Sequence, residues 1–86
     1  MYSVILSQKV DKFLNKLDSG VRDRIEERLK RLVKNPIPSD AKFIFRVEGE
    51  KVFRYRIGDF RALYKVKEDK KTILIVKIDK RPKVYH

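Results

Sequence analysis

The chain has 86 residues, enough for one domain (residues 1–86) with a single modest hydrophobic core. It contains no cysteine and one histidine, which excludes disulfide bridges and thiolate metal sites, so we expect no metal and no other cofactor. Apolar residues make up 42% of the sequence but form no run that could cross a bilayer, and no signal peptide precedes the first predicted strand, so we expect a cytoplasmic protein.

The net charge is the strongest feature of the composition. The formal charge is +11, from 23 Lys and Arg against 12 Asp and Glu. The excess is uneven, because residues 42–86 carry a net charge of +8 and residues 1–41 a net charge of +3. A surface of this sign attracts nucleic acid or an acidic protein partner. Solubility alone is the alternative explanation, since thermostable proteins are also often rich in Lys and Glu.

The first half of the chain predicts a strand followed by a helical hairpin. The β-rich run YSVILS opens the chain, and Ser7 at its end is suited to cap a helix. Apolar residues then recur at helical spacing over residues 10–17 and again over residues 21–33, giving each helix one apolar stripe. The sequence DSG separates the helices, with Ser19 as the predicted cap of the second, which continues to Lys34 before two prolines end it.

The second half changes to the alternation of β-strands. KFIFRV, KVFRYRI, FRALYKVK and TILIVKI read as four strands joined by the short turns EGE, GD and EDKK. The predicted fold class is therefore α+β: an N-terminal strand, a two-helix hairpin, then a mostly antiparallel four-strand meander. One twisted sheet would carry both helices on one face and leave its other face open to solvent.

Alternation along the two middle strands places basic residues on that open face. Arg54 and Arg56 precede the GD turn, Arg61 and Lys65 follow it, and the aromatic residues between them point the other way. Like charges facing each other across strands cost tenths of a kcal/mol up to about 1 kcal/mol, a repulsion that a bound anion would relieve. Arginine also matches phosphate bidentately, so the pattern predicts a phosphate-binding surface. A solvated face whose charges prevent aggregation is the alternative.

Nearly the full length of the chain resembles the RelE/ParE-like toxin family. The resemblance rests on the strand–helical hairpin opening, the block YRIGDFRALYKV and the ending KRPKVY. It implies the toxin of a type II toxin–antitoxin system, similar to the RelE-type mRNA interferases that cleave messenger RNA in the ribosomal A site without a metal and so inhibit translation. It also implies the partners: the ribosome, messenger RNA, and a cognate acidic RelB-like antitoxin, which can assemble with the toxin as a heterotetramer.

The resemblance also assigns roles to individual residues. By position, Arg61 would hold the scissile phosphate, Arg81 would neutralise charge in the transition state, and Tyr85 would stack on a base and share in proton transfer. His86 follows directly and is a further catalytic candidate, because it alone titrates near neutrality without perturbation. The other basic residues of these segments are predicted to bind RNA, and they are Arg54, Arg56, Lys65, Lys80 and Lys83.

Residue chemistry supports ribonuclease activity independently, although two other functions stay open. Arginines stabilise the charge of a phosphorane, whereas the sequence offers no Asp or Glu cluster for a two-metal nuclease. Asp79 is expected to pair with Arg81. One alternative is a ParE-like toxin that inhibits gyrase by binding, although ParE-like members generally lack the Arg and Tyr that stand at positions 81 and 85. The other is a basic RNA-binding domain without catalysis.

Overall fold

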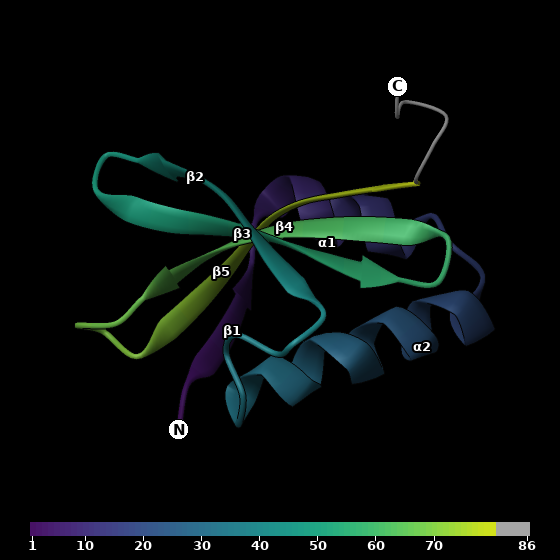
Figure 1. The fold of residues 1–86 in the computed structure, drawn as a ribbon. Helices are drawn as coiled ribbons and strands as arrows, with labels where there is room; N and C mark the ends of the chain where they lie inside the picture. The colour runs from purple at the N-terminus through teal and green to yellow at the C-terminus, as the bar shows by residue number, and fades with distance from the viewer. Residues whose placement is uncertain (81–86) are drawn as a thin grey trace.

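The computed structural model of the chain describes residues 1–80 (Figure 1). The predicted site residues Arg81, Lys83, Tyr85 and His86 lie outside this range. The described elements, in chain order, are β1 (Ser3–Leu6), α1 (Gln8–Asn15), α2 (Ser19–Lys30), a 3₁₀ turn (Arg31–Val33), β2 (Ala41–Val47), β3 (Glu50–Ile57), β4 (Phe60–Lys67) and β5 (Thr72–Lys80). Within residues 1–80, neither helix combines the length and apolarity that a membrane crossing requires.

The sheet confirms the predicted α+β fold. Among residues 1–80 it has five strands in the order β1-β5-β4-β3-β2, and β2 to β5 form the antiparallel meander expected from their short turns. β1 pairs in parallel with β5, with Ser3 opposite Thr72 and Leu6 opposite Ile75. The β3–β4 turn and the end of β5 therefore lie at one end of the sheet, and the β2–β3 and β4–β5 turns lie at the other (Figure 1).

The helix caps agree with the prediction for α1 and differ from it for α2. The Ser7 hydroxyl accepts a hydrogen bond from the Val10 N–H at 3.2 Å, as predicted, and donates one to the Val76 carbonyl at 3.1 Å. The predicted cap role of Ser19 is wrong, because Asp18 is the N-cap and Ser19 is already the first helical residue. Asp18 makes no side-chain capping bond, but its negative charge stands at the N-terminus of the helix, the positive end of the helix dipole.

The aromatic faces of β3 and β4 are buried beneath the helices, as the alternation predicted. Tyr64 is fully buried, stacks on Phe53 at 5.6 Å between ring centroids, and donates from its hydroxyl to the Pro36 carbonyl at 2.7 Å. Burial, together with the nearby Tyr55 and Asp40, raises the pKa of Tyr64 well above its usual value, so the hydroxyl stays protonated as a donor. The core comprises Val10, Leu14, Ile25, Leu29, Leu32, Phe53, Tyr55, Ile57, Ala62, Tyr64, Val66, Ile73, Ile75 and Ile78.

Two bulges interrupt the alternation that the sequence suggested. On β2, Phe43 lies opposite Phe53 but Phe45 lies opposite Val52, so Ile44 is an extra residue. On β5, Ile75 lies opposite Tyr64 but Lys77 lies opposite Leu63, so Val76 is an extra residue. Each bulge reverses which face the following residues point to, since side chains alternate strictly elsewhere in a strand.

Removing the Tyr64 hydroxyl tests the buried hydrogen bond. Tyr64→Phe should lower the free energy of unfolding by about 1 kcal/mol, because the Pro36 carbonyl loses its donor while the ring stays packed. Guanidinium denaturation followed by circular dichroism measures the change. Tyr2→Phe is the control, since the Tyr2 hydroxyl makes no hydrogen bond within residues 1–80, and equal losses in the two variants would contradict this interpretation.

Candidate functional site

Arginine side chains from neighbouring strands meet on the open face at the β3–β4 turn. Arg56 on β3 is the cross-strand partner of Arg61 on β4, so the predicted like-charge pair across this hairpin is confirmed. Arg54 stands two residues before Arg56 on the same face. These three residues form what we call the arginine cluster. The Gly58–Asp59 turn beside it requires a positive φ of 58° at Gly58, a conformation that glycine adopts without strain.

Strands β2 and β5 add two residues to this surface that the sequence did not predict for the site. Lys42 on β2 is the cross-strand partner of Arg54, and Asp79 on β5 is the partner of Arg61. Asp79 reaches the open face because of the bulge at Val76, and its carboxylate pairs with Lys77 at 3.4 Å. Had the register of β2 against β3 been known, the sequence would have predicted Lys42 as a member of this surface, because cross-strand partners lie on the same face of a sheet.

Two hollows open onto the arginine cluster, and Arg54 lines both. The first, about 340 Å³, is lined by Asp40, Lys42, Arg54, Arg56 and Gly58, and we call it the Lys42 hollow. The second, about 210 Å³, is lined by Ile44, Phe45, Arg54, Arg61, Leu63 and Asp79, and we call it the Phe45 hollow. Within residues 1–80, neither Arg54 nor Arg56 takes part in an ion pair. At this end of the sheet, these two positive charges are therefore not neutralised by a carboxylate partner within residues 1–80.

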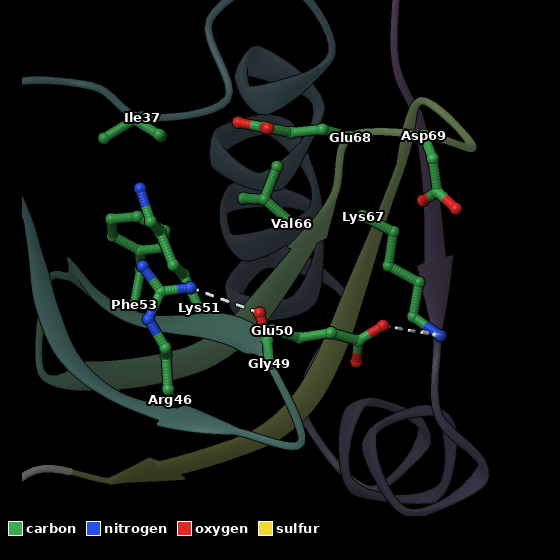
Figure 2. A pocket seen from close by; sticks show the side chains of 10 residues that line it. All are labelled: Ile37, Arg46, Gly49, Glu50, Lys51, Phe53, Val66, Lys67, Glu68 and Asp69. Carbon is green, nitrogen blue, oxygen red and sulfur yellow. Dashed lines mark hydrogen bonds and ion pairs between the residues drawn. The ribbon is translucent and has the colours of Figure 1, made fainter.

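Lys65, predicted to bind RNA, lies apart from the cluster. It stands opposite Val52, with a side chain 20% exposed, and its ammonium group pairs with Glu50 at 3.4 Å. Lys67 pairs with the same carboxylate at 3.8 Å, and Figure 2 shows Lys67 and Glu50 directed toward each other. Glu50 was assigned to a turn from the sequence, but it begins β3 and faces the open side. At this end of the sheet, Lys65 and Lys67 therefore each have a carboxylate partner, which they share.

Lys80, also predicted to bind RNA, points to the helix side. It pairs with Phe60, whose ring meets Phe13 edge-on at 6.0 Å, and it lines a groove of about 440 Å³ together with Arg24 and Arg28. Strict alternation from Ile73 would have placed Lys80 on the open face, and the bulge at Val76 reverses this. The expected Asp79–Arg81 pair lies outside the described residues.

Arg28 on α2 contacts the end of β3 from the helix side of the sheet, a role that was not predicted from the sequence. Its guanidinium donates to the Arg56 backbone carbonyl at 3.2 Å, to Asp40 at 3.4 Å and to the Tyr55 hydroxyl at 3.3 Å. It also lies 5.0 Å from the centre of the Tyr55 ring, within cation–π range. Its position three residues after Ile25 puts it at the border of the apolar stripe, which was the available signal. Arg28 thereby fixes the backbone that carries Arg56.

The side chains of this surface are of the type that proteins use to bind anions. The strands fix the backbone of each arginine, and the planar guanidinium groups can bind phosphate oxygens in pairs. Over residues 1–80, no group of three or more His, Asp or Glu side chains is arranged to hold a metal ion.

Comparison with known proteins identifies the family. Residues 4–85 match the family described as the ParE toxin of the type II toxin-antitoxin system, parDE. The chain belongs to this RelE/ParE-like toxin family. A protein of Methanocaldococcus jannaschii described as a candidate toxin, RelE1, is 35% identical over 85 residues, which cover 98% of this chain and 94% of that protein.

Solved structures of RelE-like toxins share the fold. The archaeal RelE–RelB complex from Pyrococcus horikoshii OT3 superposes with a TM-score of 0.85 at 28% identity, covering 96% of this chain and 98% of that one. The toxin–antitoxin complex RelBE2 from Mycobacterium tuberculosis gives a TM-score of 0.77 at 26% identity, covering 93% and 98%. The chain is thus similar to RelE-like toxins along almost its whole length.

The like-charge pair predicts an unusual response of stability to mutation. Arg56→Gln removes the repulsion with Arg61 and should raise the free energy of unfolding by a few tenths of a kcal/mol at low salt. The gain should shrink at about 1 M salt, where the Debye length falls to about 3 Å. Urea denaturation at both ionic strengths measures it.

Lys65→Gln is the matched control for this measurement. It breaks the pair with Glu50 and should lower the free energy of unfolding by about 0.2–1 kcal/mol. A loss of stability in Arg56→Gln as large as that in Lys65→Gln would show that Arg56 is not repelled in the folded protein.

Proposed function

We propose that this toxin is a ribosome-dependent endoribonuclease that cleaves messenger RNA in the ribosomal A site and so inhibits translation. The observation that carries the proposal is the pairing of Arg56 with Arg61, beside Arg54, on an open sheet face in a member of this toxin family. Concentrated positive charge of this kind suits a phosphate that gains negative charge during the reaction.

The proposed reaction is an internal transfer at phosphorus. The ribose 2′-oxygen attacks the adjacent phosphorus, the bond from phosphorus to the 5′-oxygen breaks, and a 2′,3′-cyclic phosphate remains. A base takes the 2′-hydroxyl proton, and an acid gives a proton to the departing 5′-oxygen. Arg61 would hold the non-bridging oxygens of the scissile phosphate, while Arg54 and Arg56 would bind phosphates on either side.

The remaining roles are proposed from the family resemblance. Arg81 would neutralise charge on the phosphorane, Tyr85 would hold a base by stacking, and His86 would carry a proton. The described chain supports this assignment in one respect. Its last residue, Lys80, pairs with Phe60, the residue next to Arg61. Lys83 and Lys80 would add phosphate contacts from the same segment.

We also propose that an acidic RelB-like antitoxin silences this toxin. Two of the similar solved structures are complexes of a RelE-like toxin with its antitoxin, which supports such a partner here. A protein of charge +11 attracts an acidic segment that folds as it binds. The segment would wrap over the arginine cluster or the helical hairpin, covering or displacing the tail, and two such pairs could join as a heterotetramer.

Inhibition of gyrase by binding is the second candidate function. The observation in its favour is that the matching family is described as the ParE toxin. It requires no RNA cleavage, so the two candidates differ in a single measurement on translating ribosomes. Primer extension on the messenger gives new 5′ ends for a nuclease and none for a gyrase inhibitor.

Substitution of the two principal arginines tests the nuclease directly. Arg61→Ala and Arg81→Ala should each slow cleavage about a hundredfold, the loss of about 3 kcal/mol expected when one transition-state contact is removed. The rate comes from primer extension on messenger incubated with translating ribosomes and purified toxin. Lys70→Ala, in the β4–β5 turn at the far end of the sheet, is the control of equal charge and should cleave normally. Undiminished cleavage in both arginine variants would rule out this site.

Two substitutions of Tyr85 separate stacking from proton transfer. Tyr85→Ala should reduce cleavage on the ribosome sharply, because the base loses the ring that holds it for in-line attack. Tyr85→Phe keeps the ring, so wild-type cleavage by this variant would assign Tyr85 to stacking and leave proton transfer to His86. Single-turnover rates on ribosomes distinguish these results. Normal cleavage by Tyr85→Ala would exclude the residue from the mechanism.

A further inference from the structure

The bulge on β2 presents an aromatic side chain to the open face. Phe43 and Phe45 stand on either side of Ile44, and without the bulge they would point the same way. Phe43 instead meets Phe53 edge-on at 5.9 Å on the helix side, whereas Phe45 lines the Phe45 hollow with Arg54. Two similar phenylalanines two residues apart on one edge strand thus face opposite sides of the sheet.

Phe45 is more exposed than folding alone would favour. Its residue surface is 47% exposed, on an edge strand where charged residues usually discourage aggregation. Ile44 and Leu63 line the same hollow, so it has apolar residues as well as charged ones. Exposed apolar surface next to concentrated charge is typical of a surface that binds something with the same two properties.

A nucleotide has both properties at a matching separation. Phe45 lies opposite Val52, and Arg54 stands two residues along β3 from Val52 on the same face. Phe45 and Arg54 are thus diagonal cross-strand neighbours, a relation in which the two residues are about 7 Å apart. A base stacked on the Phe45 ring would therefore have its phosphate within reach of the Arg54 guanidinium, because the ribose spans a similar length. Asp79, at the rim of the same hollow, offers a carboxylate that accepts hydrogen bonds from the N–H groups of a base edge.

We propose that the Phe45 hollow is a base-binding subsite for single-stranded RNA, with one base stacked on Phe45 and its phosphate on Arg54. The bound nucleotide is a neighbour of the one whose phosphate Arg61 holds, because Arg54 and Arg61 line the hollow together. The inference rests on the proposed function for the identity of the ligand as RNA. It adds a contact on β2, a strand to which the cleavage mechanism assigns no role.

A binding experiment with a matched pair of variants tests the subsite. The full chain, without ribosomes, is titrated into a short single-stranded RNA and, separately, into an oligomer of the same length in which every base is missing. Phe45→Ala should weaken binding of the RNA about tenfold, within the range for loss of one aromatic stacking contact, and leave binding of the abasic oligomer unchanged. Phe43→Ala, the control on the opposite face, should bind both like the wild type.

Salt dependence and a second variant keep the interpretation specific. The slope of log affinity against log salt should be the same for Phe45→Ala and wild type, because a stacking ring neutralises no phosphate. Phe45→Tyr keeps a flat ring and should restore the affinity. Circular dichroism and denaturation establish that each variant is folded, and if Phe45→Ala is not, Phe45→Leu, which keeps the apolar volume without the ring, should show the same loss.

The results separate this subsite from the nuclease proposal. Loss of affinity in Phe45→Ala for the abasic oligomer as well, or an equal loss in Phe43→Ala, would overturn the subsite. So would a Phe45→Ala variant that binds RNA normally but fails to capture an acidic antitoxin peptide, which would make the hollow a protein-docking surface. Phe45-dependent RNA binding together with no cleavage on ribosomes would leave the subsite standing and refute the nuclease. If the wild type cleaves messenger RNA but Phe45→Ala binds RNA as tightly as the wild type, the nuclease proposal would stand and the subsite would be refuted.

Discussion

Burial of the aromatic faces of β3 and β4 beneath the helices determines where the charged side chains of the sheet can lie. Tyr64 at the centre of this layer is fully buried and bonded to Pro36. A slip of one residue in either strand would turn Arg54 or Arg61 into the core, where an ionised group without a partner is far costlier than any repulsion on the surface. The hydrophobic register therefore holds the arginine cluster together, although its members repel one another.

The two ends of the open face have different electrostatics on one continuous sheet. At the β2–β3 turn, the Glu50 carboxylate forms ion pairs with two lysines. At the β3–β4 turn, Arg28 donates to backbone and side-chain oxygens under the strand and so stiffens it without neutralising the arginines above. Rigid support together with incomplete neutralisation is what electrostatic preorganisation requires. Within residues 1–80, Arg54 and Arg56, the open-face arginines without an ion pair, thus stand toward the β3–β4 end.

Local patterns predicted most of the fold, and the errors arose where a pattern depends on distant partners. The Ser7 cap and the strand faces around the GD turn were readable because each is determined within a few residues. The bulges were not, since three apolar residues in a row at 43–45 fit either face and nothing local marks Val76 as the extra residue. The faces on which Asp79 and Lys80 lie follow from the second bulge, so local alternation could not predict them.

The pairing of β1 with β5 has a consequence for how the chain folds. Ser3 lies opposite Thr72, which makes this contact one of the longest in sequence separation within the described chain. β1 can form no native ladder until residues 72–75 are available, whereas β2 to β4 can pair through short turns beforehand. During synthesis the first strand must therefore wait, unpaired, until the last described strand has left the ribosome. Completion of the sheet, and with it the positioning of Asp79 beside Arg61, is therefore a late step in the folding of each molecule.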